Sequence, residues 1–143
     1  MRSNWLALVI RMLLGVVLAL SGWAHLQNDL MYYADVRQYQ ILNASGSFLA
    51  SKLLPWLQIC LACCFFMDLL AKGSSVVCCC LFLVFSLAQA TILLSGRSID
   101  CGCFGVLHSE TISFTTISFA LALFCIAVLN CYTTFLTMNQ DLR

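Results

Sequence analysis

Charged residues and proline are scarce in this chain of 143 residues. Asp, Glu, Lys and Arg make up 9% of it, and it contains one proline. A soluble domain usually carries charge on about a quarter of its residues, so this composition excludes an ordinary soluble fold. The formal net charge of +1 provides neither a basic face for nucleic acid nor an acidic surface for a basic partner. We therefore expect no nucleic-acid partner.

Apolar residues dominate instead, at 62% of the chain, and the mean hydropathy is +0.97. A bilayer core about 30 Å thick takes about 20 helical residues to cross. Apolar runs of this length cover residues 5–24, 53–71, 76–95 and 112–136. We predict an all-α fold, in which residues 1–143 form a single transmembrane domain, an integral membrane four-helix bundle in the lipid bilayer.

Three polar segments connect the predicted spans. They are residues 25–52, a four-residue turn at 72–75, and a loop at 96–111 that contains the sequence CGCFG. Four spans place both termini on one side of the membrane. The first and third segments then share the opposite side, so we expect His25 near the CGCFG loop.

The distribution of basic residues gives the orientation. The terminal side carries Arg2, Lys72 and Arg143, with Arg11 just inside the first span, against Arg37, Lys52 and Arg97 on the other side, and this small excess favours cytoplasmic termini under the positive-inside rule. Residues 1–24 also imitate a cleaved signal peptide, but the apolar residues before Arg11 extend this run to a full span. We expect a bacterial inner (cytoplasmic) membrane protein with its termini in the cytoplasm.

Two of the predicted spans contain a charged residue. A charge in hydrocarbon costs several kcal/mol unless it is paired. At a rise of about 1.5 Å per residue, Arg11 and Asp68 fall in the same third of the membrane, as does Asn130. We predict that Arg11 and Asp68 form a structural intramembrane pair, with a proton path as the alternative.

Pro55 is expected in the first helical turn of the predicted span at residues 53–71, where its missing N–H costs nothing.

A second group of polar residues lies toward the other side of the membrane. Each glutamine taken alone is typical of contacts between helices. Together they outline a polar pocket at one end of the bundle, where bundles place their sites. The predicted group consists of His25, Gln58, Cys60 and Gln89.

Eight of the ten cysteines fall in apolar spans, where a thiol packs as a small hydrophobic group. Cys101 and Cys103 differ because they lie in a glycine-containing loop. A disulfide between them would close a small, strained ring, which makes it oxidising and labile. Three interpretations remain open: thiol exchange, a structural or partner-tethering disulfide, and a Cu(I) or zinc site formed with His108.

The loop sequence G-x-x-x-D-C-G-C-F-G at residues 96–105 resembles that of the methylamine utilisation protein MauE family, in the wider DoxX-like membrane protein superfamily. Further matches are RMLLG at residues 11–15, the Ser21-Gly22 pair, and LPWL at residues 54–57. The resemblance covers nearly the whole chain. Family members often carry a lysine and an acid where this chain has His25 and Gln58, which indicates a divergent member.

The resemblance implies a membrane thiol-disulfide oxidoreductase that supports disulfide formation or maturation of an extracytoplasmic partner. A thioredoxin-like protein, or another thiol protein, is the expected partner. No cofactor is required, and a quinone is the expected electron acceptor. The alternative is a non-catalytic membrane subunit. The implied catalytic residues are Cys101, Cys103 and, as a resolving thiol, Cys60; the residues expected to line a quinone or substrate pocket are His25, Gln58 and Gln89.

Overall fold

The computed structural model describes residues 5–96 and 114–140, and all regular structure in these residues is helical. The helices are α1 (Trp5–Gln27), α2 (Asp29–Gln38), α3 (Ala44–Phe66), α4 (Ala71–Leu94) and α5 (Phe114–Gln140). All but α2 are long and apolar enough to cross a membrane. The predicted all-α membrane bundle of four spanning helices is confirmed.

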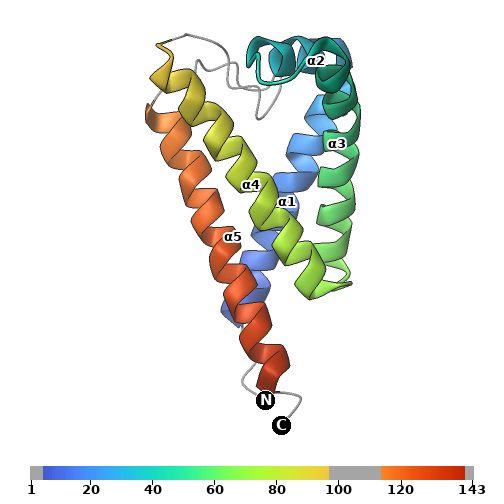
Figure 1. Cartoon of the computed structure of the whole chain (residues 1–143). Coiled ribbons are helices and arrows are strands. Elements are labelled where there is room, and N and C mark those ends of the chain that lie inside the picture. The colour runs from blue at the N-terminus through green and yellow to red at the C-terminus, as the bar shows by residue number, and fades with distance from the viewer. Residues whose placement is uncertain (1–4, 97–113, 141–143) are drawn as a thin grey trace.

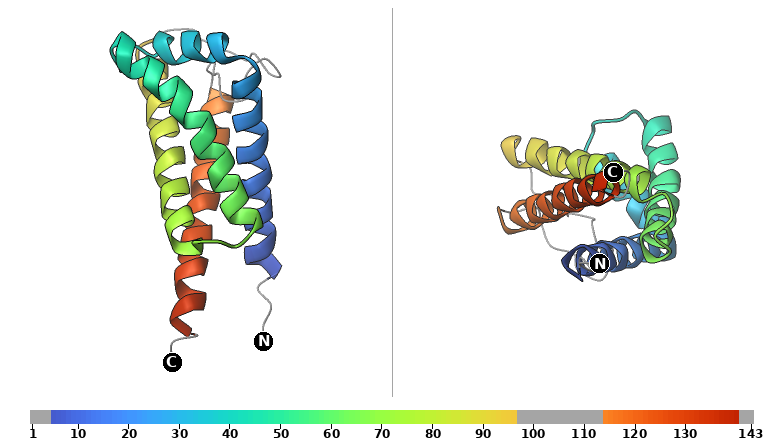
Figure 2. Two further views of the ribbon diagram at one scale, coloured as in Figure 1. Left: turned by 90° about the vertical axis from the view of Figure 1, so that its right-hand side faces the viewer. Right: turned by 90° about the horizontal axis from the view of Figure 1, so that it is seen from below.

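The long helices associate as two antiparallel pairs (Figure 1). Helix α1 packs along α3, and α4 packs along α5; the pairs meet where α1 contacts α5 and α3 contacts α4. They diverge toward the end of the bundle that α2 covers, which we call the α2 end (Figures 1 and 2). The start of α1 and the end of α5 lie at the opposite end, which we call the terminal end.

Helix α2 occupies part of the segment that the sequence suggested was a polar connection. Its first residue, Asp29, forms an ion pair with Lys52 of α3. A carboxylate at a helix start is also favourable, because the first backbone N–H groups have no partner within the helix. Tyr32 is buried and its ring stacks on His25 at the end of α1. These contacts fix α2 across the end of the α1–α3 pair.

Helix α3 begins at Ala44, nine residues before the predicted span. The expectation that Pro55 lies in the first turn is therefore wrong, because it is buried in the helix interior. Spanning helices tolerate an internal proline, since neighbouring helices and hydroxyl side chains compensate for the lost hydrogen bond. Lys52 forms an ion pair with Asp29, which lies just beyond the end of α1. These two charged residues are therefore next to residue 53, where the sequence predicted the second span to begin.

The reversal between α3 and α4 also differs from the prediction. The chain turns over residues 67–70, where Asp68 and Leu70 have φ values of 53° and 50°. The predicted turn at 72–75 is instead the first turn of α4. Polar residues fit there because the Ser74 and Ser75 hydroxyls donate hydrogen bonds to backbone carbonyls four residues back.

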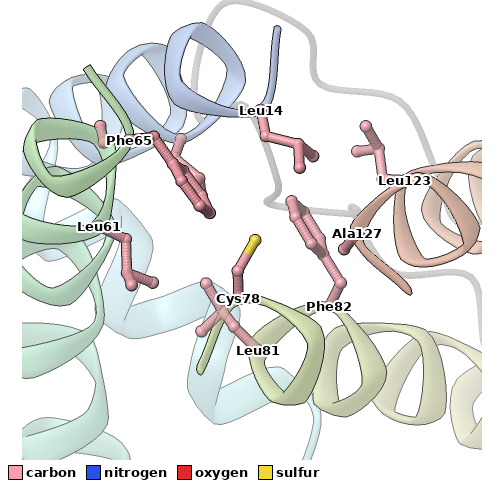
Figure 3. Packing of buried hydrophobic residues seen from close by; sticks show 10 residues of the cluster. Leu14, Leu61, Phe65, Cys78, Leu81, Phe82, Leu123 and Ala127 are labelled. Atoms are coloured by element: carbon pink, nitrogen blue, oxygen red, sulfur yellow. The ribbon is translucent and has the colours of Figure 1, made fainter. Parts of the chain in front are cut away.

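An apolar belt holds the two helix pairs together in the middle of the bundle (Figure 3). Its side chains come from all four long helices and point toward one another. Because lipid solvates apolar groups as well as the belt does, close packing stabilises it more than hydrophobic burial. The belt consists of Leu14, Leu18, Leu61, Ala62, Phe65, Cys78, Leu81, Phe82, Leu123 and Ala127.

Helix α1 approaches α3 closely at Gly22. A Cβ atom there would lie 2.9 Å from Cγ1 of Ile59 and 3.0 Å from the carbonyl oxygen of Pro55. The second contact is with backbone, which cannot rotate away as a side chain can. Gly22 thus allows the two helices to pack at a distance that any larger residue would increase.

We expect Gly22→Leu to loosen the α1–α3 pair, at a cost of about 1–3 kcal/mol for overpacking. Gly73→Leu is the matched control, because nothing lies within 4 Å of the Cβ position at Gly73. Thermal unfolding in detergent micelles should show a lower midpoint for Gly22→Leu and no loss for Gly73→Leu. Equal midpoints for the two variants would contradict the close approach.

Candidate functional site

Buried polar side chains gather on both sides of the apolar belt. Those at the α2 end include His25, Gln58 and Gln89, which the sequence singled out, and each is at most 2% exposed. They lie on the buried faces of three different helices, α1, α3 and α4. We call these three residues the α2-end polar group.

His25 is held in place by two contacts within the α2 end. Its imidazole stacks on Tyr32, with ring centroids 3.9 Å apart and an interplanar angle of 18°. The Ser21 hydroxyl, one helical turn earlier, lies 3.3 Å from Nε2 of His25. Tyr32 was not anticipated from the sequence, because its segment was expected to be a polar connection rather than a helix packed on α1. The ring is therefore fixed in orientation and shielded from solvent.

Gln58 faces α1 from α3. Its Cβ lies 3.2 Å from the Cβ position at Gly22, one turn from His25, so both side chains occupy the α1–α3 interface. The Oε1 atom of Gln58 is buried and accepts no hydrogen bond from residues 5–96 or 114–140. A buried amide oxygen without a donor costs about 1–3 kcal/mol. Gln58 is therefore the residue of this group that is a candidate for binding a hydrogen-bond donor.

Gln89 comes from the other helix pair. It lies on the inner stripe of α4, two turns beyond Phe82 of the apolar belt, or about 10 Å toward the α2 end. Ser86 is buried on the same stripe and donates a hydrogen bond to the carbonyl oxygen of Phe82. The buried face of α4 is therefore apolar within the belt and polar between the belt and the α2 end.

The structure does not bring Cys60 into this group. Residues two apart on a helix point about 200° apart, so the burial of Gln58 turns Cys60 outward. Its side chain is exposed on the outer surface of the bundle. The prediction that Cys60 serves as a resolving thiol beside the pocket is therefore at odds with its position.

Cys101, Cys103 and His108 lie outside the described residues. The residues that flank this segment, Gly96 and Phe114, are at the α2 end, where α4 ends and α5 begins (Figure 1). Within residues 5–96 and 114–140, no three His, Cys, Asp or Glu side chains form a potential metal site.

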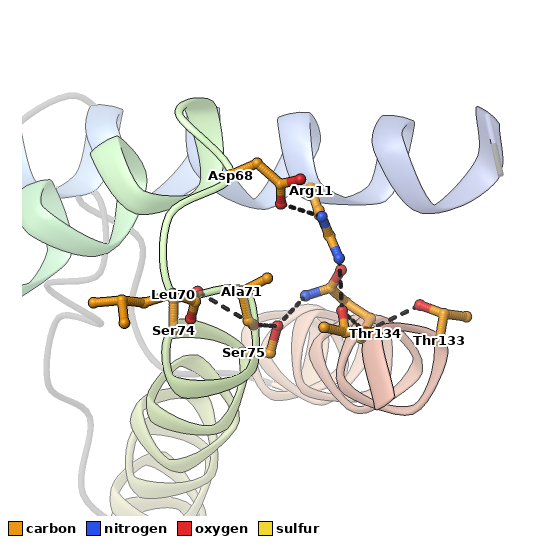
Figure 4. A network of polar contacts seen from close by, with 9 residues as sticks. Arg11, Asp68, Leu70, Ala71, Ser74, Ser75, Thr133 and Thr134 are labelled. Atoms are coloured by element: carbon orange, nitrogen blue, oxygen red, sulfur yellow. Dashed lines mark hydrogen bonds and ion pairs between the residues drawn. The ribbon is translucent and has the colours of Figure 1, made fainter. Parts of the chain in front are cut away.

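A separate polar network lies at the terminal end (Figure 4). Arg11 of α1 forms an ion pair with Asp68 and donates a hydrogen bond of 3.0 Å to the Thr134 hydroxyl of α5. Asn130 donates one of 3.0 Å to the Ser75 hydroxyl of α4. The network therefore ties α1, α4, α5 and the α3–α4 turn together.

Asp68 occupies a different environment from the one predicted. It lies in the turn after α3, not within a spanning helix, and its side chain is 69% exposed, against 18% for Arg11. The chain must reverse direction there, and Asp adopts a positive φ more readily than most residues because its short polar side chain bonds locally. The pair therefore joins α1 to the turn after α3 at the terminal end.

Comparisons with protein-family models and with curated proteins both identify the same family. The family model described as methylamine utilisation protein MauE matches residues 3–133. A curated relative from Paracoccus denitrificans, described as methylamine utilization protein MauE, is 34% identical over 101 residues. The match covers 70% of this chain and 53% of the relative, so it spans about half the relative's length. No solved structure matches the chain significantly.

Arg11 is much less exposed than Asp68, so we expect substitution of Arg11 to lower the free energy of unfolding more than substitution of Asp68. Arg11→Leu should cost about 1.5–3 kcal/mol, because the charge-assisted bond to buried Thr134 is lost together with the ion pair. Asp68→Asn should cost about 0–1 kcal/mol, the usual value for an exposed pair. Lys52→Met, which breaks the exposed ion pair at the α2 end, is the control for the smaller effect. Denaturant unfolding in micelles measures all three; equal losses for Arg11→Leu and Asp68→Asn would contradict the assignment.

Proposed function

The chain belongs to the methylamine utilisation protein MauE family, and we propose that it is a membrane thiol/disulfide redox protein of methylamine utilisation. In this proposal it supports disulfide formation in, or maturation of, an extracytoplasmic partner. Cys101 and Cys103 are the exchanging pair, and a thioredoxin-like protein is the expected class of partner. The α2 end then faces the extracytoplasmic side, and both termini face the cytoplasm.

The α2-end polar group is the observation that carries the proposal. Three polar side chains are buried together at the α2 end, and the Oε1 atom of one of them, Gln58, accepts no hydrogen bond from a described residue, which is costly unless a bound molecule donates one. An imidazole and two primary amides offer both donors and acceptors without a net charge. This combination suits a neutral molecule with carbonyl or hydroxyl oxygens that enters from the bilayer.

A quinone head fits that description, and the amide of Gln58 is suited to both of its redox forms. The amide N–H group can donate to a quinone carbonyl. The Oε1 atom, which lacks a donor within the described residues, can accept from a quinol hydroxyl. One side chain therefore provides a hydrogen bond to the acceptor before and after reduction.

The exchange balances in two steps. A partner dithiol reduces the Cys101–Cys103 disulfide through a mixed disulfide, so the partner gains a disulfide and the loop becomes a dithiol. The loop dithiol then returns to the disulfide as two electrons and two protons pass to the quinone, which becomes a quinol. In this scheme His25, Gln58 and Gln89 bind and orient the quinone head.

Single-cysteine variants test the exchange. Cys101→Ser or Cys103→Ser should trap the partner as a mixed disulfide, because the second thiol that releases it is missing. Non-reducing gels and mass determination of the captured protein provide the measurement. If neither variant captures a thioredoxin-like protein that is co-expressed with it, the non-catalytic subunit replaces this function.

The pocket is tested by quinone turnover in the chain with both loop cysteines present, and by mixed-disulfide capture in the Cys101→Ser variant. Gln58→Leu should weaken turnover with decylubiquinone about two- to thirteenfold, which corresponds to the loss of one hydrogen bond of about 0.5–1.5 kcal/mol. It should leave mixed-disulfide capture unchanged. Cys63→Ser is the matched control, because Cys63 is an exposed residue of the same helix. Unchanged quinone turnover in Gln58→Leu would remove Gln58 from the quinone site, and absence of turnover in the unsubstituted chain would remove the quinone from the scheme.

A further inference from the structure

Helix α3 provides a second buried acceptor near Gln58, at the point where Pro55 interrupts its hydrogen bonding. Proline has no backbone N–H, so the carbonyl group of Ser51, four residues earlier, loses its partner within the helix. Ser51 is 1% exposed and Pro55 is less than 2% exposed, so both lie away from bulk solvent. The Ser51 carbonyl oxygen is therefore a buried acceptor whose usual donor is missing.

The hydroxyl groups on this part of α3 donate elsewhere. The Ser51 hydroxyl donates a hydrogen bond of 2.8 Å to the carbonyl oxygen of Phe48. The Ser47 hydroxyl donates one of 3.4 Å to the carbonyl oxygen of Leu42. Because a hydroxyl has a single proton to donate, neither group replaces the missing N–H. The Ser51 carbonyl oxygen is thus available to a donor from a bound molecule.

Ser51, Pro55 and Gln58 share one face of α3. Positions four and seven residues apart lie within about 60° of one another around a helix. Gly22 of α1 packs on this face, with its Cβ position 3.0 Å from the carbonyl oxygen of Pro55 and 3.2 Å from Cβ of Gln58. The Oε1 atom of Gln58 is also buried and accepts no hydrogen bond from residues 5–96 or 114–140. Two acceptor oxygens are therefore available on one buried face.

The two acceptors differ in what they offer to a quinone head. The Gln58 amide can rotate about its last side-chain bond and present its N–H group in place of Oε1. The backbone carbonyl of Ser51 is fixed by the helix and can only accept. The oxygens of a quinone head also only accept, whereas a quinol has hydroxyl groups that donate. The Ser51 carbonyl can therefore form a hydrogen bond with the reduced form alone.

On the basis of the proposed function, we propose that this face of α3 binds a quinol more tightly than the corresponding quinone, with the Ser51 carbonyl and Oε1 of Gln58 as acceptors. Tighter binding of the reduced form raises the reduction potential of the bound couple, by about 30 mV for each tenfold difference in affinity. The bound quinone is then a stronger oxidant than the free quinone in the bilayer. Pro55 thereby favours the transfer of two electrons and two protons from the loop dithiol to the quinone.

The test compares the affinities of both forms for the full chain with Cys101→Ser and Cys103→Ser, which cannot react with them through the loop. Thermal unfolding in detergent micelles without oxygen is followed at increasing decylubiquinone or decylubiquinol, because a ligand of the folded state raises the midpoint. Decylubiquinol should bind about two- to thirteenfold more tightly, the effect of one additional hydrogen bond. Equal affinities, or tighter binding of decylubiquinone, would overturn the proposal.

Pro55→Ala supplies a backbone N–H to the Ser51 carbonyl, so it should weaken decylubiquinol binding by the same factor and leave decylubiquinone binding unchanged. Ser51→Ala is the matched control, because it removes the hydroxyl and keeps the carbonyl, and it should retain the preference. A folded Pro55→Ala protein with an undiminished preference would also overturn the proposal. If Pro55→Ala does not fold, the ratio of affinities in the chain with Pro55 decides.

The outcomes separate this proposal from the proposed function. Loss of the preference for decylubiquinol leaves the quinone step and the thiol exchange in place. Absence of binding of both forms would overturn the preference and remove the quinone from the scheme. Mixed-disulfide capture by the single-cysteine variants tests the exchange itself independently of either result.

Discussion

The apolar belt is the constraint on which the rest of the structure depends. Leu14 of α1, Phe65 of α3, Phe82 of α4 and Ala127 of α5 meet in the middle of the bundle and hold two helix pairs that diverge toward the α2 end. Lipid tails are as apolar as these side chains, so the helices associate through close packing and not through the hydrophobic effect. Gly22 contributes to that packing by letting α1 approach the backbone of α3.

The belt also separates two polar layers with different roles. At the terminal end, Arg11 connects a turn and two helices through an ion pair and a hydrogen bond, which is the arrangement of a brace. Both layers contain a buried side-chain oxygen that accepts no hydrogen bond from a described residue, Oε1 of Gln58 at the α2 end and Oδ1 of Asn130 at the terminal end. A proton moving between the layers would have to cross a belt of apolar side chains, which favours the brace over the proton path. The proposed binding chemistry lies at the α2 end, beside the segment that contains Cys101 and Cys103 in the sequence.

The sequence predicted the features that hydropathy and charge control. Span number, antiparallel order and the meeting of Arg11 with Asp68 follow from run lengths and from the cost of an unpaired charge near the bilayer. Features that depend on tertiary contacts were missed. Helix α2 forms because Tyr32 packs on His25, and the turn at 67–70 could not be distinguished from helix by its apolar residues. The outward position of Cys60 required the helical phase, which a uniformly apolar run does not reveal.

The central proposal is that the chain performs thiol exchange through an oxidising Cys101–Cys103 pair. Its most direct test is the reduction potential of that pair, obtained by equilibrating the full chain in nanodiscs with thiol/disulfide buffers of graded potential and measuring the oxidised fraction by thiol alkylation and mass. The account predicts a potential above about −300 mV, the range of labile and catalytic disulfides. A value below about −300 mV, which is typical of a structural disulfide in a secreted protein, would contradict it.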